Sequence, residues 1–113
     1  MELTRLLYVS TAAFDTTPED ARAIAEQSAV SNVKAEITGA MAFNGVNFAQ
    51  ILEGPYGNVH ELLKTINSDS RHSGTIVVSE QTVSSRKYSD WGMKFISGLS
   101  FDELLDAMHN TGH

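Results

Sequence analysis

A glutamine at position 50 lies inside an otherwise apolar segment, where its polar chemistry requires an explanation. The segment Asn47–Leu52 predicts a strand, in which Phe48, Gln50 and Leu52 point to the same face. Phe48 and Leu52 favour a buried core, and a carboxamide left unsatisfied beside them costs about 1–3 kcal/mol. Gln50 therefore needs a hydrogen-bonding partner, which is a protein group, water or a ligand.

The phenol of Tyr8 is the first candidate partner for Gln50. Leu3–Ser10 predicts a strand in which Leu6, Tyr8 and Ser10 share one face. A single hydroxyl leaves the carboxamide with further hydrogen-bonding capacity. If small residues line the space beside the pair, a buried amide and phenol indicate a ligand site. The alternative for Tyr8 is a tyrosine that only packs in the core.

Two helices are expected to cover these strands. The first begins with Thr17 as N-cap and Pro18 at its first position. Its buried face consists of small residues and one isoleucine, at Ala21, Ile24, Ala25 and Ser28. The second helix is expected to begin at Pro55 and to end at Asn67–Asp69, with an apolar stripe at Val59, Leu62, Leu63 and Ile66. The small face of the first helix leaves room for a flat ligand between the helices.

The remaining segments predict further strands and a final helix. Ile37–Phe43 predicts the second strand, and Asn44-Gly45 is a hairpin signal because both residues can take positive φ. The strand Asn47–Leu52 returns from this turn. Thr75–Val83 and Trp91–Ile96 predict the fourth and fifth strands, and Ser100 caps a short last helix.

The order βαββαββ predicts an α+β, ferredoxin-like fold. We expect a mixed five-stranded sheet with two helices on one face, plus a short C-terminal helix. The first and third strands are expected to be central, parallel neighbours joined by a crossover, which brings Tyr8 and Gln50 together.

Composition limits the classes of function. The 113 residues predict one domain, with a net charge of −6 and no block of Lys or Arg. We therefore expect no nucleic-acid or membrane partner, and a cytoplasmic location. The absence of cysteine excludes disulfides, thiolate metal sites and cysteinyl cofactor bonds. Of the four histidines, only His109 and His113 have a spacing that suits a metal, and they flank an expected frayed tail.

Six short motifs resemble the BLUF family of flavin-binding blue-light sensors, in the right order over residues 3–97. They are Leu-Tyr-Val-Ser at 7–10, Ser-Asn at 31–32, Ile-Thr-Gly-Ala-Met at 37–41, Phe-Ala-Gln-Ile-Leu-Glu-Gly at 48–54, Asp-Ser-Arg-His at 69–72 and Asp-Trp-Gly-Met at 90–93. Each motif is weak alone, but their common order is specific. The fold of that family is the ferredoxin-like fold expected above.

The resemblance implies a flavin site between the two helices. Ile24 and Ile66 would flank the flavin ring, Asn32 would bind its pyrimidine edge, and Gln50 would lie between the ring and Tyr8. Asp69, Arg71 and His72 would lie toward the ribityl or phosphate group, which suits a guanidinium. The implied cofactor is FAD, with FMN and riboflavin as alternatives.

The resemblance also implies a photochemical switch without a covalent bond to flavin. Tyr8 would give an electron and a proton to the excited flavin, and Gln50 would relay the proton and be left with changed hydrogen bonds. Trp91 and Met93, on the last strand, would pass the change on. Residues 1–97 would form the sensor and residues 98–113 a short helix and tail. The expected partners are flavin, an unidentified downstream protein and further copies of the chain.

Three positions depart from the family pattern. Ser31 replaces the usual Asn or His, so its flavin contact is lost or passes through water. Ala49 replaces a bulkier apolar residue, and Thr65 lacks the basic group that some relatives have. These departures concern flavin affinity and the choice between FAD and FMN.

Two other functions remain open at this level. One is a flavin-free regulatory module with the same topology, for which Asn32 is only a helix C-cap. The other is an acylphosphatase-like enzyme, although Ala49 stands where that chemistry needs an arginine. We expect a sensor and not an enzyme.

Overall fold

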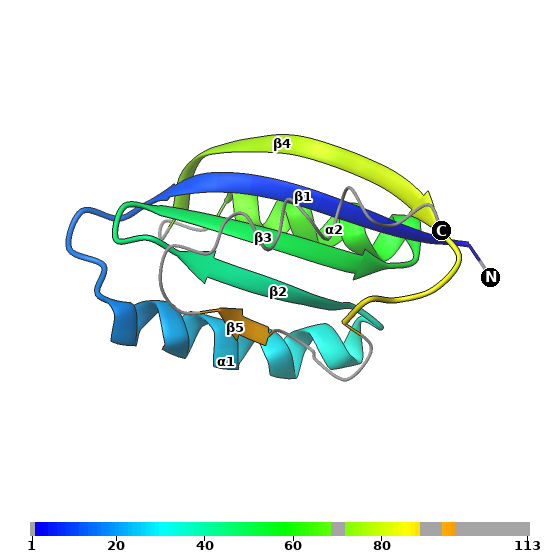
Figure 1. Ribbon diagram of the computed structural model, residues 1–113, viewed down its shortest axis with the longest axis horizontal. Helices are drawn as coiled ribbons and strands as arrows, with labels where there is room; N and C mark the ends of the chain where they lie inside the picture. Colours follow the sequence, from blue (N-terminus) through cyan, green and yellow to red (C-terminus); the bar gives the residue numbers. More distant parts are fainter. Residues whose placement is uncertain (1, 69–71, 89–93, 97–113) are drawn as a thin grey trace.

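The computed structural model describes residues 2–68, 72–88 and 94–96, and its elements follow the expected order (Figure 1). The elements are β1 (Leu3–Ala12), α1 (Pro18–Lys34), β2 (Thr38–Phe43), β3 (Asn47–Gly54), α2 (Tyr56–Asn67), β4 (His72–Val83) and β5 (Lys94–Ile96). The expected helix after Ser100 and the first part of the expected last strand, residues 91–93, lie outside the described residues.

The strands form one five-stranded sheet in the order β4-β1-β3-β2-β5. β5 pairs with β2 in parallel and the other pairings are antiparallel, so the expected mixed sheet is confirmed. The expectation that β1 and β3 are parallel is wrong. α1 returns the chain so that β2 runs in the same direction as β1, and the hairpin then reverses it into β3. The crossover therefore connects β1 to β2, with β3 inserted between them.

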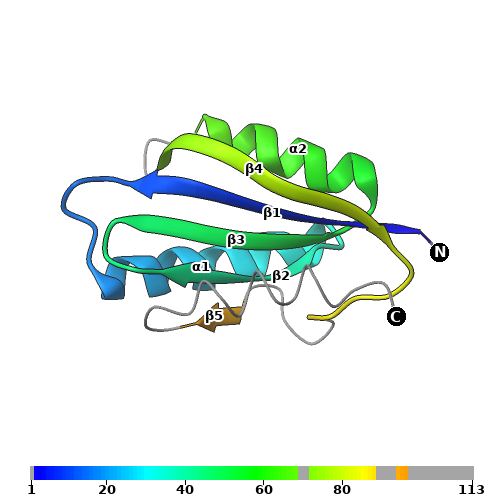
Figure 2. The same ribbon diagram turned by 45° about the horizontal axis from the view of Figure 1, so that its top comes forward.

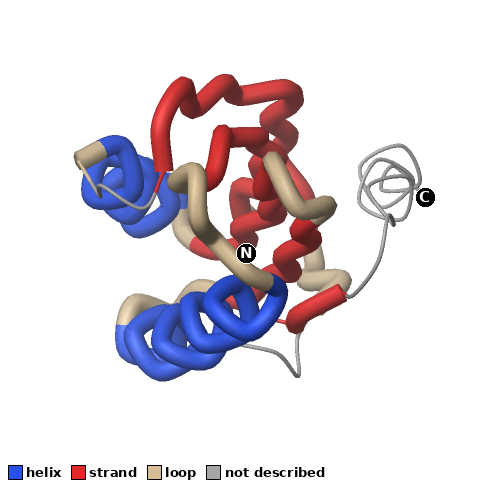
Figure 3. Tube along the Cα trace, turned by 90° about the vertical axis from the view of Figure 1, so that its left-hand side faces the viewer, coloured by secondary structure: helices blue, strands red, loops and turns tan. Residues whose placement is uncertain are grey.

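Both helices cover the same face of the sheet (Figures 2 and 3). α1 contacts β2 and β5, whereas α2 contacts β1, β3 and β4. Because strand side chains alternate, the sheet has two apolar faces. The helix-side core includes Leu6, Tyr8, Ala21, Ile24, Ala25, Met41, Phe48, Leu52 and Val59. The opposite core consists of Leu7, Ala40, Ala42, Ala49, Ile51 and Tyr88.

Local signals explain the ends of the helices. A capping box starts α1, with the Asp20 amide donating to Thr17 Oγ1 at 3.1 Å and the Thr17 amide donating to Asp20 Oδ2 at 3.0 Å. α1 ends at a turn in which Glu36 takes a φ of 61° and the Ile37 amide donates to the Asn32 carbonyl at 2.8 Å. Pro55 precedes α2 as its N-cap and is not its first residue, which corrects the expected start by one position.

The β2–β3 hairpin forms at Asn44-Gly45, as expected, but the two residues act differently. Only Gly45 has a positive φ, of 98°. Asn44 instead uses its side chain, whose Oδ1 accepts from the amides of Val46 at 3.0 Å and Asn47 at 2.7 Å. At the end of β2 away from the hairpin, a Cβ at Gly39 would collide with the backbone oxygen of Ile51. Glycine at 39 therefore permits the close approach of β2 to β3.

Candidate functional site

Tyr8 and Gln50 lie directly opposite each other on the two neighbouring strands β1 and β3. Met41 on β2 is the partner of Gln50 on its other side. Side chains of directly paired residues on one sheet face have Cβ atoms about 4.5–5.5 Å apart. The register therefore brings the phenol and the carboxamide together, as the sequence predicted, although the two strands are antiparallel.

The environment of Gln50 is nearly dry. Tyr8 and Met41 are 0% exposed and Gln50 is 3% exposed. Within residues 2–68, 72–88 and 94–96, no hydrogen bond joins the Gln50 carboxamide to another group. A buried amide of this kind needs a partner, and a polar ligand atom can be one.

The two helices present apolar side chains to this part of the sheet. Ile24 on α1 is buried, and Ile66 on α2 is partly buried against the same helix-side core as Tyr8. The neighbouring α1 positions are Ala21 and Ala25, which are 0% and 1% exposed. Two isoleucines from different helices thus enter one core with small residues beside them, and this arrangement suits a flat ring.

Asn32 and its neighbour Ser31 have opposite environments. Asn32 is 1% exposed in the last turn of α1, whereas Ser31 is exposed. The C-cap of α1 is Ala35, so the reading of Asn32 as a C-cap is wrong. Asn32 therefore remains a candidate for binding a polar ring edge, while Ser31 lies on the outer surface.

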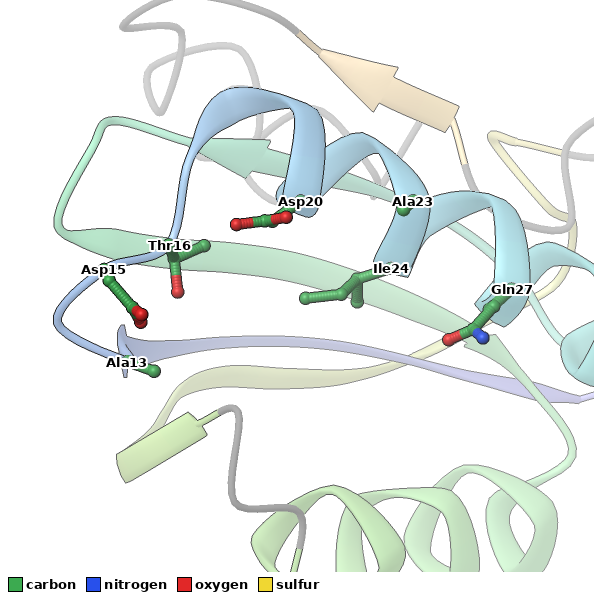
Figure 4. A pocket seen from close by; sticks show the side chains of 7 residues that line it. All are labelled: Ala13, Asp15, Thr16, Asp20, Ala23, Ile24 and Gln27. Carbon is green, nitrogen blue, oxygen red and sulfur yellow. The ribbon is translucent and has the colours of Figure 1, made fainter.

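A cavity of about 370 Å³ lies beside Ile24, between α1 and the loop that precedes it (Figure 4). This volume falls within the range of about 300–1,000 Å³ that is typical of small-molecule sites. Its lining residues are Ala13, Asp15, Thr16, Asp20, Ala23, Ile24 and Gln27. Sequence reasoning singled out only Ile24 among them. For the loop residues Ala13, Asp15 and Thr16, the available signal was the loop itself, because loops beside a rigid sheet often contribute ligand contacts. Asp20, Ala23 and Gln27 lie on α1.

The described residues fit a flavin. Gln50 is a buried amide with hydrogen-bonding capacity, Ile24 and Ile66 approach from the two helices, and the cavity adjoins Ile24. His72 begins β4 opposite Ala12, at the end of β1 that leads into the cavity loop. The other expected site residues, Asp69, Arg71, Trp91 and Met93, lie outside the described residues.

A charged cluster on the opposite face of the sheet was not predicted from the sequence. Arg5 Nε donates to Glu53 Oε2 at 2.8 Å, and the two side chains are only 4% and 0% exposed. The available signal was parity: Arg5 shares its strand face with Leu7, and Glu53 shares its face with Ile51. Opposite charges at facing positions in apolar strands predict a buried ion pair.

Metal and membrane sites find no support in the described part of the chain. It holds no group of three or more His, Cys, Asp or Glu residues arranged to bind a metal ion. His60 makes a surface contact, with its Nε2 3.1 Å from Glu80 Oε2. None of the helices within the described ranges is long and apolar enough to cross a membrane.

Comparison with known proteins identifies the family. The model of the family described as sensors of blue-light using FAD matches residues 3–94. The blue light- and temperature-regulated antirepressor BluF of Escherichia coli (strain K12) is 29% identical over 97% of this chain and 28% of its own length. The photoactivated adenylate cyclase subunit alpha of Euglena gracilis is 32% identical over 82% of this chain and 9% of its own length. The chain thus spans less than a third of these relatives.

Solved structures give the same result. The dark-state structure of the BLUF protein BlrB has a TM-score of 0.79 and 33% identity, and covers 85% of this chain and 73% of its own. The BLUF structure of BlrP1 has a TM-score of 0.82 and 28% identity, and covers 100% of this chain and 81% of its own. The acylphosphatase-like alternative is thereby set aside, and the ferredoxin-like fold is confirmed. The chain belongs to the BLUF family of flavin-binding blue-light sensors.

Proposed function

We propose that Tyr8 and Gln50 form the light-driven switch of this BLUF chain. The observation that carries the proposal is their direct pairing on β1 and β3, with both side chains buried. Gln50 has no hydrogen bond to another described group, so its amide is ready to bond a ligand. A tyrosine supplies an oxidisable group beside it.

The neighbouring side chains hold the flavin in this proposal. Ile24 and Ile66 flank its ring, and the buried Asn32 bonds its pyrimidine edge. Ser31, which is exposed, contributes through water. Asp69, Arg71 and His72 are assigned to the ribityl or phosphate side on the resemblance of their motif, Asp-Ser-Arg-His.

The protein groups move a proton along a short route. Photoexcited flavin, when bound, supplies an oxidant strong enough to take an electron from a phenol. Tyr8 loses that electron together with its hydroxyl proton, because a phenol radical cation is a strong acid. Gln50 accepts a hydrogen bond at Oε1 and donates from Nε2, so it can carry the proton. The electron and the proton then return to Tyr8, which regains its starting redox state. The dry core favours this route over exchange with water. Gln50 ends in a different hydrogen-bonding arrangement, which is the stored signal.

The signal is proposed to leave through the last strand. Trp91 and Met93 have the same strand parity, so a shift of two residues exchanges them without turning the strand over. Residues 1–97 act as the sensor, and residues 98–113 act as the short output segment. The partner in this proposal is a downstream protein in the cytoplasm, and the chain acts as a homo-oligomer. Neither nucleic acid nor a membrane is a proposed partner. The chain is assigned a sensory function and no enzymatic reaction of its own.

FAD is the proposed cofactor, with FMN and riboflavin as alternatives. The family description names FAD, whereas the description of one related BlrP1 structure names FMN. The three flavins have nearly the same absorption spectrum, so the bound flavin must be extracted and identified by chromatography.

The test of this function is an absorption spectrum of the purified chain, reconstituted with flavin, before and after blue light. The proposal expects a flavin spectrum that shifts slightly to the red in light and returns in the dark. A bound flavin without the shift would contradict the switch. No binding of FAD, FMN or riboflavin would contradict the site and favour the flavin-free regulatory module.

A further inference from the structure

The carboxylate of Glu53 is fully enclosed and fully hydrogen-bonded. Glu53 is 0% exposed. Its Oε2 accepts from Arg5 Nε at 2.8 Å and from the Lys87 amide at 2.7 Å. Its Oε1 accepts from Thr38 Oγ1 at 2.9 Å and from the Tyr88 amide at 2.9 Å. Each oxygen thus joins a strand residue to the connector between β4 and β5.

Arg86 forms a second attachment of the same connector. Its Nη1 donates to Thr38 Oγ1 at 3.1 Å and to the Glu53 carbonyl at 2.9 Å. Its Nη2 donates to the Glu36 carbonyl at 2.7 Å. Glu36 is the residue with a φ of 61°, in the turn that ends α1. The guanidinium therefore bonds to both central-sheet backbone and the end of α1, in the fork geometry that Arg provides.

The connector is also held by packing and by a third polar contact. Arg5 Nη2 donates to the Ser85 carbonyl at 3.3 Å. Tyr88 is 6% exposed and belongs to the core on the face opposite the helices. We define residues 85–88 together with Arg5, Thr38 and Glu53 as the clamp. The clamp fixes the connector to β1, β2 and β3 at once.

The position of the clamp relates it to both ends of the proposed signal. Glu53 lies on β3, as Gln50 does, but on the other face of the sheet. β5 follows the clamp in the chain, and its described residues pair with β2 from Lys94 opposite Ala40 to Ile96 opposite Ala42. The clamp is the described anchor that precedes β5 in the chain, so it is placed to influence the register in which β5 pairs with β2.

We propose that Glu53 is a positioning residue that sets the register of β5 and is the fixed point against which β5 shifts in light. The shift itself rests on the proposed function of Tyr8 and Gln50. Because Glu53 touches neither of these side chains, its effect passes through the connector. Without the clamp, β5 no longer has one defined register relative to β2 in the dark. The change of register between the dark and lit states then becomes smaller.

The variant Glu53→Gln tests this proposal at constant side-chain size. An amide nitrogen replaces one carboxylate oxygen. That nitrogen cannot accept a hydrogen bond, so the side-chain donor and the backbone donor that bonded the replaced oxygen both lose their acceptor. Because Lys87 and Tyr88 bond different carboxylate oxygens, only one of the two amides loses its acceptor. We expect hydrogen exchange at that amide to rise about tenfold, as for the loss of one buried hydrogen bond. We also expect faster dark exchange at Lys94–Ile96, and at least about a threefold smaller light-induced change there. The dark flavin spectrum should not change, because the flavin site lies on the other face.

Two further variants separate positioning from a general loss of stability. Arg86→Lys keeps the charge but loses the fork, and Arg86 is only partly buried. Arg86→Lys should also speed dark exchange at Lys94–Ile96 and reduce the light-induced change there, by smaller factors than Glu53→Gln. Glu80→Gln makes the same chemical change on β4, at the surface contact between Glu80 and His60 of α2. This matched control should leave exchange at Lys94–Ile96 unchanged.

The outcomes decide between the alternatives. If exchange rises at Lys87 or Tyr88 but Lys94–Ile96 behave as in the unmodified chain, Glu53 is only structural and the proposal is overturned. If the unmodified chain shows no light response, the proposed switch fails instead. The positioning role is then decided by dark exchange at Lys94–Ile96: faster exchange in both clamp variants supports it, and unchanged exchange overturns it. If Glu53→Gln does not fold, Arg86→Lys decides by the same criterion.

Discussion

Gln50 and Glu53 lie on the same strand, and both are buried polar residues, yet their surroundings differ completely. The Gln50 carboxamide has no hydrogen bond to any other described group and faces the helices. The Glu53 carboxylate accepts from four donors on the opposite face. A polar group without a described protein partner is open to a ligand, whereas one that accepts from four donors is held in place. The first environment is suited to ligand binding and rearrangement, and the second to a fixed anchor.

The largest expected effect comes from removing the Glu53 carboxylate. Glu53→Ala leaves the Arg5 charge buried without its partner, which typically costs about 3–5 kcal/mol. The free energy of unfolding, measured by urea denaturation, should fall by that amount. Combining Glu53→Leu with Arg5→Met should recover only part of the loss, because the Lys87 and Tyr88 amides still lack their acceptor. A loss below about 1 kcal/mol for Glu53→Ala would contradict the anchor.

Substitution of Gln50 is expected to raise the free energy of unfolding, whereas substitution of Glu53 lowers it. In the flavin-free protein, Gln50→Leu removes a buried carboxamide without a described partner, so the free energy of unfolding should rise by about 1 kcal/mol. The same variant should lose the light-induced shift when flavin is bound. The measurement is again urea denaturation, followed by spectroscopy of the reconstituted protein. A clear loss of stability would mean that the carboxamide is satisfied in the folded protein, and the contrast with Glu53 would be wrong.

The smallest change in the free energy of unfolding is expected at Glu80. Because its contact is at the surface, it is the reference for the two buried positions. Its contact with His60 is about one-third exposed on both sides, with side-chain exposures of 35% and 33%. Surface pairs of this kind contribute about 0–1 kcal/mol. Glu80→Gln should therefore change the free energy of unfolding by less than about 0.5 kcal/mol, measured in the same urea series. A larger loss would show that burial does not explain the difference between the carboxylates.

The sequence predicted most of the fold because its local signals agree with one another. Thr17, Pro18 and the Asn44-Gly45 turn define element ends through their own chemistry. Alternation along β1 and β3 predicted which side chains share a face, and the expected adjacency of the two strands predicted that Tyr8 and Gln50 meet. The relative direction of β1 and β3 depends on how the chain crosses and turns. That is a property of the whole topology, and here the prediction was wrong.

The site was predicted less completely, for a physical reason. Tyr8, Gln50, Ile24 and Asn32 are buried residues whose strand or helix periodicity predicts their face. The cavity residues Asp15 and Gln27 are exposed, and exposed side chains have no such periodic signal. The clamp was missed because two of the four donors to the Glu53 carboxylate are backbone amides of the connector. Amino-acid type carries no information about where a backbone amide points.

The most direct test of the account compares the two buried tyrosines on opposite faces of the sheet. Tyr8 is 0% exposed and lies on the helix side, and Tyr88 is 6% exposed and lies in the opposite core. Tyr→Phe removes one hydroxyl in each case, so the two variants are chemically matched. The measurement is the light-minus-dark absorption spectrum of each variant after flavin reconstitution. The account predicts that Tyr8→Phe binds flavin but loses the red shift, whereas Tyr88→Phe keeps it. A full shift in Tyr8→Phe would contradict the assignment of the switch to the helix-side face.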